Sequence, residues 1–295
     1  MPNRTRPLSH PLIPGRRAAV PGVLAAALAS LLAGGVLDPA PAAAASSPSG
    51  STSADFPASV QAQGKARVTA AVLDLDGTGR EPALYGADTP YDTASIIKVD
   101  ILAARLLQAQ DSGHGLTAQE RAQAEKMIKQ SDNTAANALW RRIGLASGLR
   151  TANQRLGLTS TTGGPGAKWG LTRTTASDQI RLLRAVFDTG AAATTTSKPV
   201  LDEPSRAYIR TLMGGVAAEQ SWGVSAAAGS GWALKNGWLQ RNTTGLWDIN
   251  SVGRITTGGH RYLVAVLSDG NKSMKDGVAL VERAARTAVS TTTAH

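Results

Sequence analysis

The 295-residue chain contains no cysteine. This absence excludes disulfide bonds, thiolate catalysis and a zinc site built on cysteine ligands. Histidine is nearly as scarce, since the four histidines are scattered without the spacing of metal ligands. We therefore expect neither a metal ion nor any other cofactor in the functional site.

Acidic residues are also few, with 21 Asp and Glu against 31 Lys and Arg, and the net charge is +10. Such an excess can indicate nucleic-acid binding, but here the basic residues form no strip interleaved with aromatic side chains. We therefore expect no nucleic-acid partner. Aromatic residues make up only 4% of the chain and hydrophobic residues 42%, a balance that fits an alanine-rich globular protein with a substantial core.

Long apolar runs are missing except near the N-terminus. Arginines including Arg16 and Arg17 precede an apolar stretch from Ala18 to Leu37, and an alanine run follows in which Ala43-x-Ala45 fits a signal peptidase site. Glycines and prolines interrupt the stretch, which disfavours a membrane anchor. We expect a signal peptide at 1–45, export by the Sec route or, given the arginine pair, the twin-arginine route, and no membrane span after cleavage.

The rest of the chain predicts a flexible serine-rich start at 46–54 and one folded domain at 55–295, expected to be monomeric. Hydrophobic periodicity and turn residues predict strands at both ends of this domain and helices between them. We expect an α/β fold of the α+β type, in which an antiparallel sheet joins the N- and C-terminal segments under a cover of helices, beside an all-helical subdomain. The expected strands are Ala66–Leu75, Ala83–Tyr85, Leu234–Gln240, Trp247–Ile255 and Tyr262–Leu267, and the expected helices are Pro57–Gln63, Asp92–Gln110, Thr117–Lys129, Asn133–Arg142, Ala176–Phe187 and Lys275–Val289.

The helix expected at Asp92–Gln110 is apolar nearly all round, which predicts that it is buried. Ser95 and Lys98 lie three residues apart near its start and therefore share one face. A lysine is costly in such a place unless a partner or a lowered pKa accommodates it. The pair can act as a nucleophile with its own base, although one such spacing is also expected by chance in a chain of this length.

Two further short motifs follow in order. Ser131-Asp132-Asn133 opens a predicted helix, and its simplest interpretation is an N-cap. Lys235-Asn236-Gly237 lies in the first C-terminal strand, where a solvent-facing lysine beside a bulge glycine is the ordinary interpretation. Neither motif is specific alone.

Together the three motifs form the series S-x-x-K, S-D-N and K-[T]-G, with Asn236 at the place of the usual Thr or Ser. This series resembles that of the serine β-lactamases and penicillin-binding proteins, and of the class A β-lactamases in particular. The resemblance covers roughly residues 55 to 290 and implies a β-lactamase/transpeptidase-like fold.

The resemblance also implies roles for individual residues. Ser95 would be the acylated nucleophile and Lys98 the base that accepts its proton, while Ser131 would pass a proton to the leaving nitrogen. The remaining residues would bind the substrate: Asn133 through its amide, Lys235 through its charge, Asn236 through its amide, Gly237 by letting the strand come close, and Trp238 through a backbone N–H that completes an oxyanion hole with that of Ser95.

The largest departure from the family pattern is a missing carboxylate. Class A enzymes carry a glutamate in an E-x-x-L-N loop that activates the deacylating water. Between Asp132 and Asp178 this chain has no Asp or Glu but six Lys and Arg residues. Either the loop is merely shortened and its charges are solvated, or acylation survives while fast β-lactam turnover is lost. Arg241 is the nearest candidate for the family's second carboxylate anchor.

The sequence therefore predicts a secreted serine hydrolase that acts on β-lactam or related amide and ester bonds through an acyl-enzyme, with slow deacylation. Its substrate would be a small molecule or a cell-wall peptide with a carboxylate. Two alternatives stay open: a peptidase for D-alanyl-D-alanine ends of wall peptides, and a covalent β-lactam or muropeptide receptor that is acylated and not released.

Overall fold

The structure is a computed structural model that describes residues 54–56, 60, 62, 64–189 and 199–293. The signal peptide expected at 1–45 lies outside these residues, as do nearly all of the flexible segment expected at 46–54 and most of the helix expected at Pro57–Gln63. All helices and strands named below belong to the compact unit Ser49–His295.

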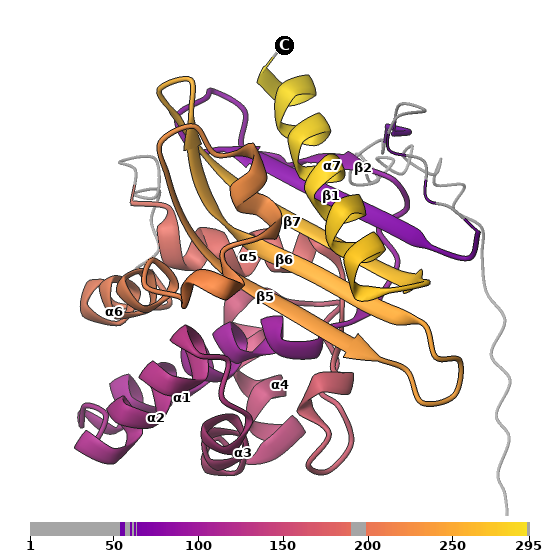
Figure 1. The fold of residues 1–295 in the computed structure, drawn as a ribbon. Coiled ribbons are helices and arrows are strands. Elements are labelled where there is room, and N and C mark those ends of the chain that lie inside the picture. Colours follow the sequence, from indigo (N-terminus) through magenta and orange to yellow (C-terminus); the bar gives the residue numbers. More distant parts are fainter. Residues whose placement is uncertain (1–53, 57–59, 61, 63, 190–198, 294–295) are drawn as a thin grey trace, which may run out of the picture. The chain divides into compact units, whose positions relative to one another are not determined.

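An antiparallel five-stranded sheet forms the centre of this unit (Figure 1). Its strand order is β2-β1-β7-β6-β5, so the strand nearest the N-terminus pairs with the last strand of the chain. The pairing of β1 with β7 runs from Arg67 opposite Asp269 to Asp74 opposite Tyr262. This confirms the expected union of the two ends of the domain. The strands are β1 (Arg67–Asp74), β2 (Ala83–Tyr85), β5 (Gly231–Gln240), β6 (Trp247–Thr257) and β7 (His260–Asn271).

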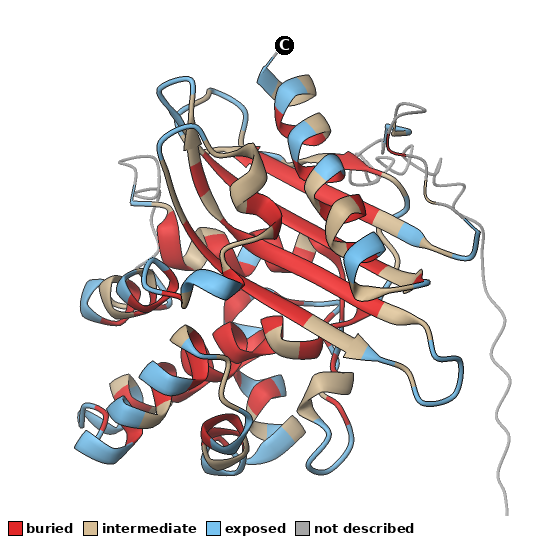
Figure 2. Cartoon of the chain, viewed as in Figure 1, coloured by how far each residue is buried: buried red, intermediate tan, exposed pale blue. Residues whose placement is uncertain are grey.

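Helices cover both faces of the sheet. The C-terminal helix α7 (Met274–Thr293) crosses one face, in front of the strands in Figure 1, and α5 (Ala176–Phe187) packs on the other face, behind them. Because side chains alternate along a strand, β7 supplies both sides: Val264 and Val266 belong to the cluster under α7, and Ala265 and Leu267 to the cluster under α5. Figure 2 shows the resulting buried band along the strands.

The central helix α1 (Ile97–Ser112) begins later than the sequence predicted. Tyr91–Asp92 forms a short strand β3 instead, and Ala94–Ile96 forms a 3-10 turn, η2, that leads into α1. The expected burial is confirmed, since Ile97, Val99, Ile101 and Leu102 are completely buried, as is Lys98. The helix ends at Gly113, whose φ of 67° suits glycine.

Four more helices complete the helical part of the chain. Two of them were predicted: α2 (Ala118–Lys129), which starts with the capping box of Thr117 and Glu120, and α3 (Asn133–Arg142). The other two, α4 (Leu145–Leu156) and α6 (Glu203–Met213), were not predicted. No helix among the described residues is long and apolar enough to cross a membrane.

Candidate active site

Ser95 lies in the 3-10 turn η2, directly against the edge strand β5. It is half-buried between the buried residues Ala94 and Ile96. A Cβ atom on Gly237 would lie 2.7 Å from both the Ser95 backbone nitrogen and the Thr93 carbonyl oxygen, so only glycine allows β5 to come this close. The expected role of Gly237 as the residue that permits close approach fits this geometry.

Asn250 ties this turn to the sheet. Its amide Nδ2 donates to the carbonyl oxygens of Asp92 (2.9 Å) and Thr93 (3.1 Å), and its Oδ1 accepts from the Ser268 backbone N–H (3.1 Å). Asn250 is completely buried and lies opposite Gly237 in the β5–β6 pairing. Its contacts therefore fix the backbone just before Ser95 relative to the strand that carries Lys235.

Two residues of the site have a strained backbone. Ala94 has φ = 46° and Ser131 has φ = 55°, values that residues with a Cβ rarely adopt. Only one other non-glycine residue in the described part of the chain, Leu145, has a positive φ. Such strain concentrates at functional sites, where the surrounding structure holds the conformation in place.

The amine of Lys98 makes hydrogen bonds to the Ser131-Asp132-Asn133 motif. Its Nζ donates to the Ser131 carbonyl oxygen (2.6 Å), the Ser131 Oγ (3.0 Å) and the Asn133 Oδ1 (2.9 Å). Asp132, between these two residues, accepts a hydrogen bond from the Ala135 N–H and caps α3. The N-cap interpretation of this motif is thus correct for Asp132, while Ser131 and Asn133 contact the lysine.

A second buried amine meets the same hydroxyl. Lys235 Nζ is 3.0 Å from Ser131 Oγ and 2.9 Å from the Asn236 carbonyl oxygen. Lys235 is completely buried, which excludes the interpretation of a solvent-facing lysine. Ser131 therefore lies between two amines, one from α1 and one from β5.

The surroundings of these amines disfavour their charged forms. Burial lowers the pKa of Lys98 to about 7, against the opposing effect of the Asp132 charge. Burial also lowers the pKa of Lys235 well below its usual value, and the charge of Lys98 lowers it further. In the described part of the chain no carboxylate makes a hydrogen bond to either amine. A proton shared among these groups can therefore leave Lys98 neutral near pH 7, as a general base requires.

Asn236 occupies a different position from the one expected. Its Nδ2 donates to the carbonyl oxygens of Gln220 (2.8 Å) and Trp222 (2.9 Å), so both amide hydrogens are used, and the residue is almost completely buried. Because residues alternate along a strand, its side chain lies on the face opposite Lys235 and Gly237. The structure therefore does not bring the Asn236 amide to the substrate side of β5.

The side chain of Trp238 lies on the same far face. Its ring is 6.1 Å from that of Trp222, and it packs against the cluster covered by α7. Only the backbone N–H of Trp238 can therefore face the substrate, and this is the group that the oxyanion-hole hypothesis requires.

Arg241 forms ion pairs away from the proposed substrate position, since its guanidinium pairs with Asp92 and lies 3.7 Å from Asp248. The suggestion that Arg241 is the second carboxylate anchor is therefore not supported.

The loop between α4 and α5 closes the site beside Lys98. Trp169 begins the short 3-10 helix η3 (Trp169–Leu171), and its ring centroid lies 4.9 Å from Lys98 Nζ. Its indole N–H donates to the Asn137 Oδ1 at 2.7 Å. Sequence reasoning missed both Trp169 and Asn137. The one available signal was a lone tryptophan in a glycine-rich segment.

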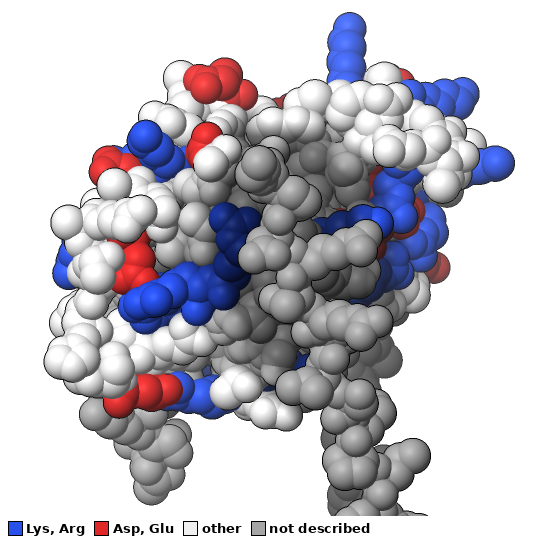
Figure 3. All heavy atoms as spheres, turned by 90° about the horizontal axis from the view of Figure 1, so that it is seen from below, with Lys and Arg blue, Asp and Glu red and all other residues white. Residues whose placement is uncertain are grey.

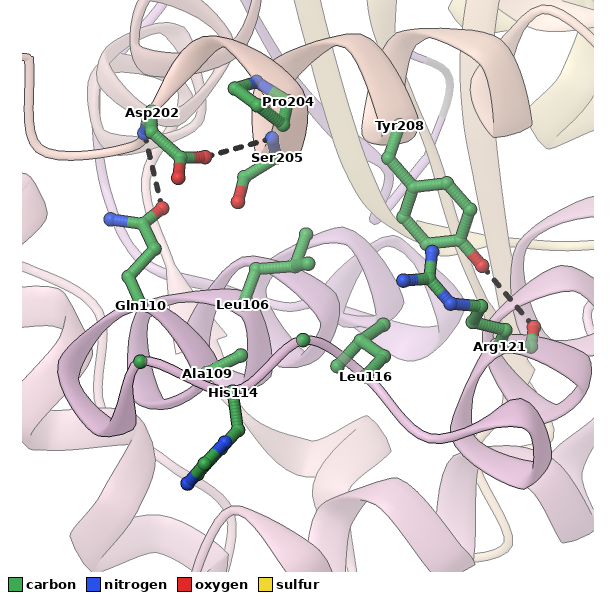
Figure 4. Close-up of a pocket in the computed structure, with 12 residues that line it drawn as sticks. Leu106, Ala109, Gln110, His114, Leu116, Arg121, Asp202, Pro204, Ser205 and Tyr208 are labelled. Atoms are coloured by element: carbon green, nitrogen blue, oxygen red, sulfur yellow. Dashed lines mark hydrogen bonds between the residues drawn. The ribbon is translucent and has the colours of Figure 1, made fainter.

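A pocket and the surface distribution of basic residues were compared with the position of the three motifs. A pocket of about 310 Å³ separates the C-terminal half of α1 from α6, with Leu106, Gln110, Arg121 and Tyr208 among its lining residues (Figure 4). It contains none of the motif residues. On the face drawn in Figure 3, the Lys and Arg side chains lie in separate groups among neutral atoms. No cluster of three or more potential metal ligands occurs in the described residues.

Comparison with protein families supports the relationship suggested by the three motifs. Residues 110–292, more than half of the chain, match a family described as Beta-lactamase enzyme family. The chain belongs to this β-lactamase family. In this β-lactamase-family protein, the matched range contains Ser131 and Lys235. Ser95 and Lys98 lie before its start. No curated protein matches the chain.

Solved structures establish the fold. A variant of PBP-A, captured as an acyl-enzyme complex with penicillin G, is 21% identical with a TM-score of 0.62, over 79% of this chain and 92% of that one. A class A β-lactamase representative from Bacteroides cellulosilyticus is 16% identical with a TM-score of 0.64, over 78% and 93%. The TLA-3 extended-spectrum β-lactamase is 15% identical with a TM-score of 0.66, over 77% and 94%. This β-lactamase-family protein thus has the β-lactamase/transpeptidase-like fold.

Proposed function

We propose that this protein is an exported active-site-serine hydrolase that forms an acyl-enzyme at Ser95 with β-lactams or related amide and ester substrates, and that deacylates slowly. The observation that carries this proposal is the meeting of two buried amines at Ser131 Oγ, one of them from a strand whose Gly237 packs against the backbone of the half-buried Ser95. We further propose that residues 1–45 are removed on export, by the Sec or the twin-arginine route, and that 55–295 acts as a monomeric domain.

In the proposed acylation, Ser95 Oγ attacks the substrate carbonyl carbon while neutral Lys98 accepts the hydroxyl proton. The oxyanion is stabilised by the backbone N–H groups of Ser95 and Trp238. The carbon–nitrogen bond then breaks, and Ser131 delivers a proton to the leaving nitrogen. Ser131 can supply this proton because its Oγ contacts both amines and is replenished from the lysine pair.

Slow deacylation follows from the groups available for activating water. A general base contributes a factor of about 10²–10⁴ to such a step. The described residues place no carboxylate in hydrogen-bond contact with Lys98, Ser131 or Lys235, and Glu219, the nearest acid before β5 in the sequence, is exposed in the 3-10 helix Ala218–Gln220. A mutant of PBP-A, a protein of the same fold, was captured as an acyl-enzyme complex with penicillin G, which supports acylation of such a site by a β-lactam.

Burst kinetics test this function. Mixing the mature protein with a chromogenic cephalosporin in a stopped-flow instrument is expected to release close to one equivalent of product rapidly, followed by a weak steady state. Intact mass should show the adduct at Ser95 throughout. Rapid turnover without an accumulated adduct, unchanged in Glu219→Gln, would mean that an unrecognised base activates water. An adduct that never decays would identify the covalent receptor, and release of D-alanine from a wall pentapeptide would identify the peptidase.

Lys235 provides a second test, because a carboxylate that pairs with this buried amine must stabilise its charged form. Lys235→Met should weaken acylation by carboxylate-bearing substrates by about 1.5–3 kcal/mol, the usual scale for hydrogen bonds to charged groups, and should hardly affect neutral esters. Lys168→Met, which changes an exposed lysine, is the matched control. Equal losses for both substrate types would assign Lys235 to the proton path through Ser131 and not to carboxylate binding.

A further inference from the structure

Trp169 covers the amine of the proposed general base. Its ring lies 4.9 Å from Lys98 Nζ, within the range of cation–π contact, and Lys98 has no exposed surface at all. The other contacts of the amine are the oxygens of Ser131 and Asn133. No side of the Lys98 amine is therefore open to solvent.

The orientation of Trp169 is fixed from α3. Asn133 and Asn137 lie one helical turn apart on this helix, so their side chains share a face. Asn133 accepts from Lys98, and Asn137 accepts the indole N–H at 2.7 Å. The polar edge of Trp169 is thus turned to Asn137, which leaves an apolar ring face toward the amine.

The loop that carries Trp169 is itself anchored at several points. The Trp140 indole N–H donates to the Gly166 carbonyl oxygen (2.8 Å), and the Thr93 N–H donates to the Thr172 carbonyl oxygen (2.8 Å). Within the loop, the Gly164 N–H donates to Thr172 Oγ1 at 3.0 Å. A Cβ on Gly164 would lie 2.1 Å from the Lys168 carbonyl oxygen, so this packing requires glycine. These contacts hold Trp169 against Lys98 without any acidic residue in the loop.

We propose that Trp169 is a positioning residue that excludes water from Lys98 in the acyl-enzyme and thereby sets the lifetime of the adduct. This inference rests on the proposed function. Hydrolysis of the adduct needs a water oxygen to bond to the ester carbon, the bond from that carbon to Ser95 Oγ to break, and one water proton to return to Ser95. Lys98 is the base proposed for that proton, and the indole covers the side of its amine that the Ser131 and Asn133 oxygens leave free.

The test compares Trp169→Ala, which opens this space, with Trp169→Phe, which keeps a ring there. After acylation with penicillin G and removal of excess ligand, intact mass follows the decay of the adduct. At a pH above the Lys98 pKa of both proteins, where the amine is neutral in each, we expect Trp169→Ala to accelerate decay by at least about tenfold, part of the factor of about 10²–10⁴ that proton transfer supplies. Trp169→Phe should stay near the native rate. Trp232→Ala, a partly buried tryptophan on the α7 side of the sheet, controls for loss of an aromatic side chain elsewhere.

A second readout needs no turnover. In protein carrying ¹³C-labelled lysine, with the Lys98 signal assigned through Lys98→Met, Trp169→Ala should raise the Lys98 pKa because water would solvate the charged amine. An unchanged Lys98 pKa in folded Trp169→Ala overturns the inference, even if the native protein is never labelled and the proposed function fails. Unchanged decay in Trp169→Ala, or equal acceleration in Trp232→Ala, overturns it as well.

Discussion

Replacing Ser95 by alanine is expected to abolish covalent labelling of the protein by penicillin G and by a fluorophosphonate probe, with almost no change in the midpoint of thermal unfolding. The first effect follows because the substitution removes the only oxygen proposed to form the ester. The second follows because the Ser95 side chain makes no hydrogen bond with the residues that the structure describes, and its replacement by a smaller side chain leaves Ile96 and the contact with Gly237 in place.

The measurement is intact mass after incubation with each probe, accompanied by a thermal melt. Ser230→Ala, which changes an exposed serine in the turn before β5, should be labelled like the native protein. Labelling retained in Ser95→Ala would show that another hydroxyl is the nucleophile. Ser131 would then be the first candidate, because it contacts both amines.

The loss of Lys98 is expected to have the second largest effect. Lys98→Met keeps most of the side-chain volume and removes the amine, and it should slow acylation by at least about a hundredfold, within the factor of about 10²–10⁴ usual for a general base. Because Lys98 is buried without a carboxylate partner, removing its amine should not destabilise the fold as breaking an ion pair would.

The role of Lys98 as a base also predicts how the acylation rate depends on pH. The pKa of Lys98 is lowered by burial to about 7, so the amine is protonated below this pH and neutral above it. Only the neutral amine accepts the Ser95 proton, and the acylation rate should therefore rise with pH through about 7 and then level off. Lys98→Met should lose this rise, whereas the exposed-site control Lys126→Met should keep it. An acylation rate that is equal in native protein and Lys98→Met at all pH values would make Lys98 structural.

The sequence predicted the sheet well because its signals are local. The continuous apolar runs of β1 and β7 and the glycine-containing turns between strands depend on neighbours along the chain. α2 and α3 carry clear cap residues at Thr117 and Asp132. α4 lacks such a signal, since it starts after Gly144 in a left-handed conformation and has Gly148 in its first turn. α6 does have an N-cap, Asp202, but the helix follows a stretch rich in alanine and threonine that carries no apolar periodicity.

Only the site residues that belong to the three motifs could be predicted from the sequence. The resemblance of the three motifs to one family predicted that Ser95, Ser131 and Lys235 share a site. The structure places Ser131 in contact with both lysines and the Ser95 backbone against Gly237. The face on which a strand residue lies depends on register, and so Asn236 was expected beside Lys235 but lies on the opposite face. Trp169 could not be assigned, because its contact with Lys98 arises from the packing of a loop more than sixty residues away in sequence.

The pairing of β1 with β7 has a consequence for the order of folding. Val68 lies opposite Ser268, so the sheet cannot be completed until almost the whole domain has been synthesised. Contacts between such distant residues carry a large loop-closure cost and slow the folding of a domain. While the helical part between them can begin to form during synthesis, β1 remains without its central neighbour until β7 has left the ribosome. A nascent chain that stops before β7 should therefore stay sensitive to proteases throughout the β1 segment.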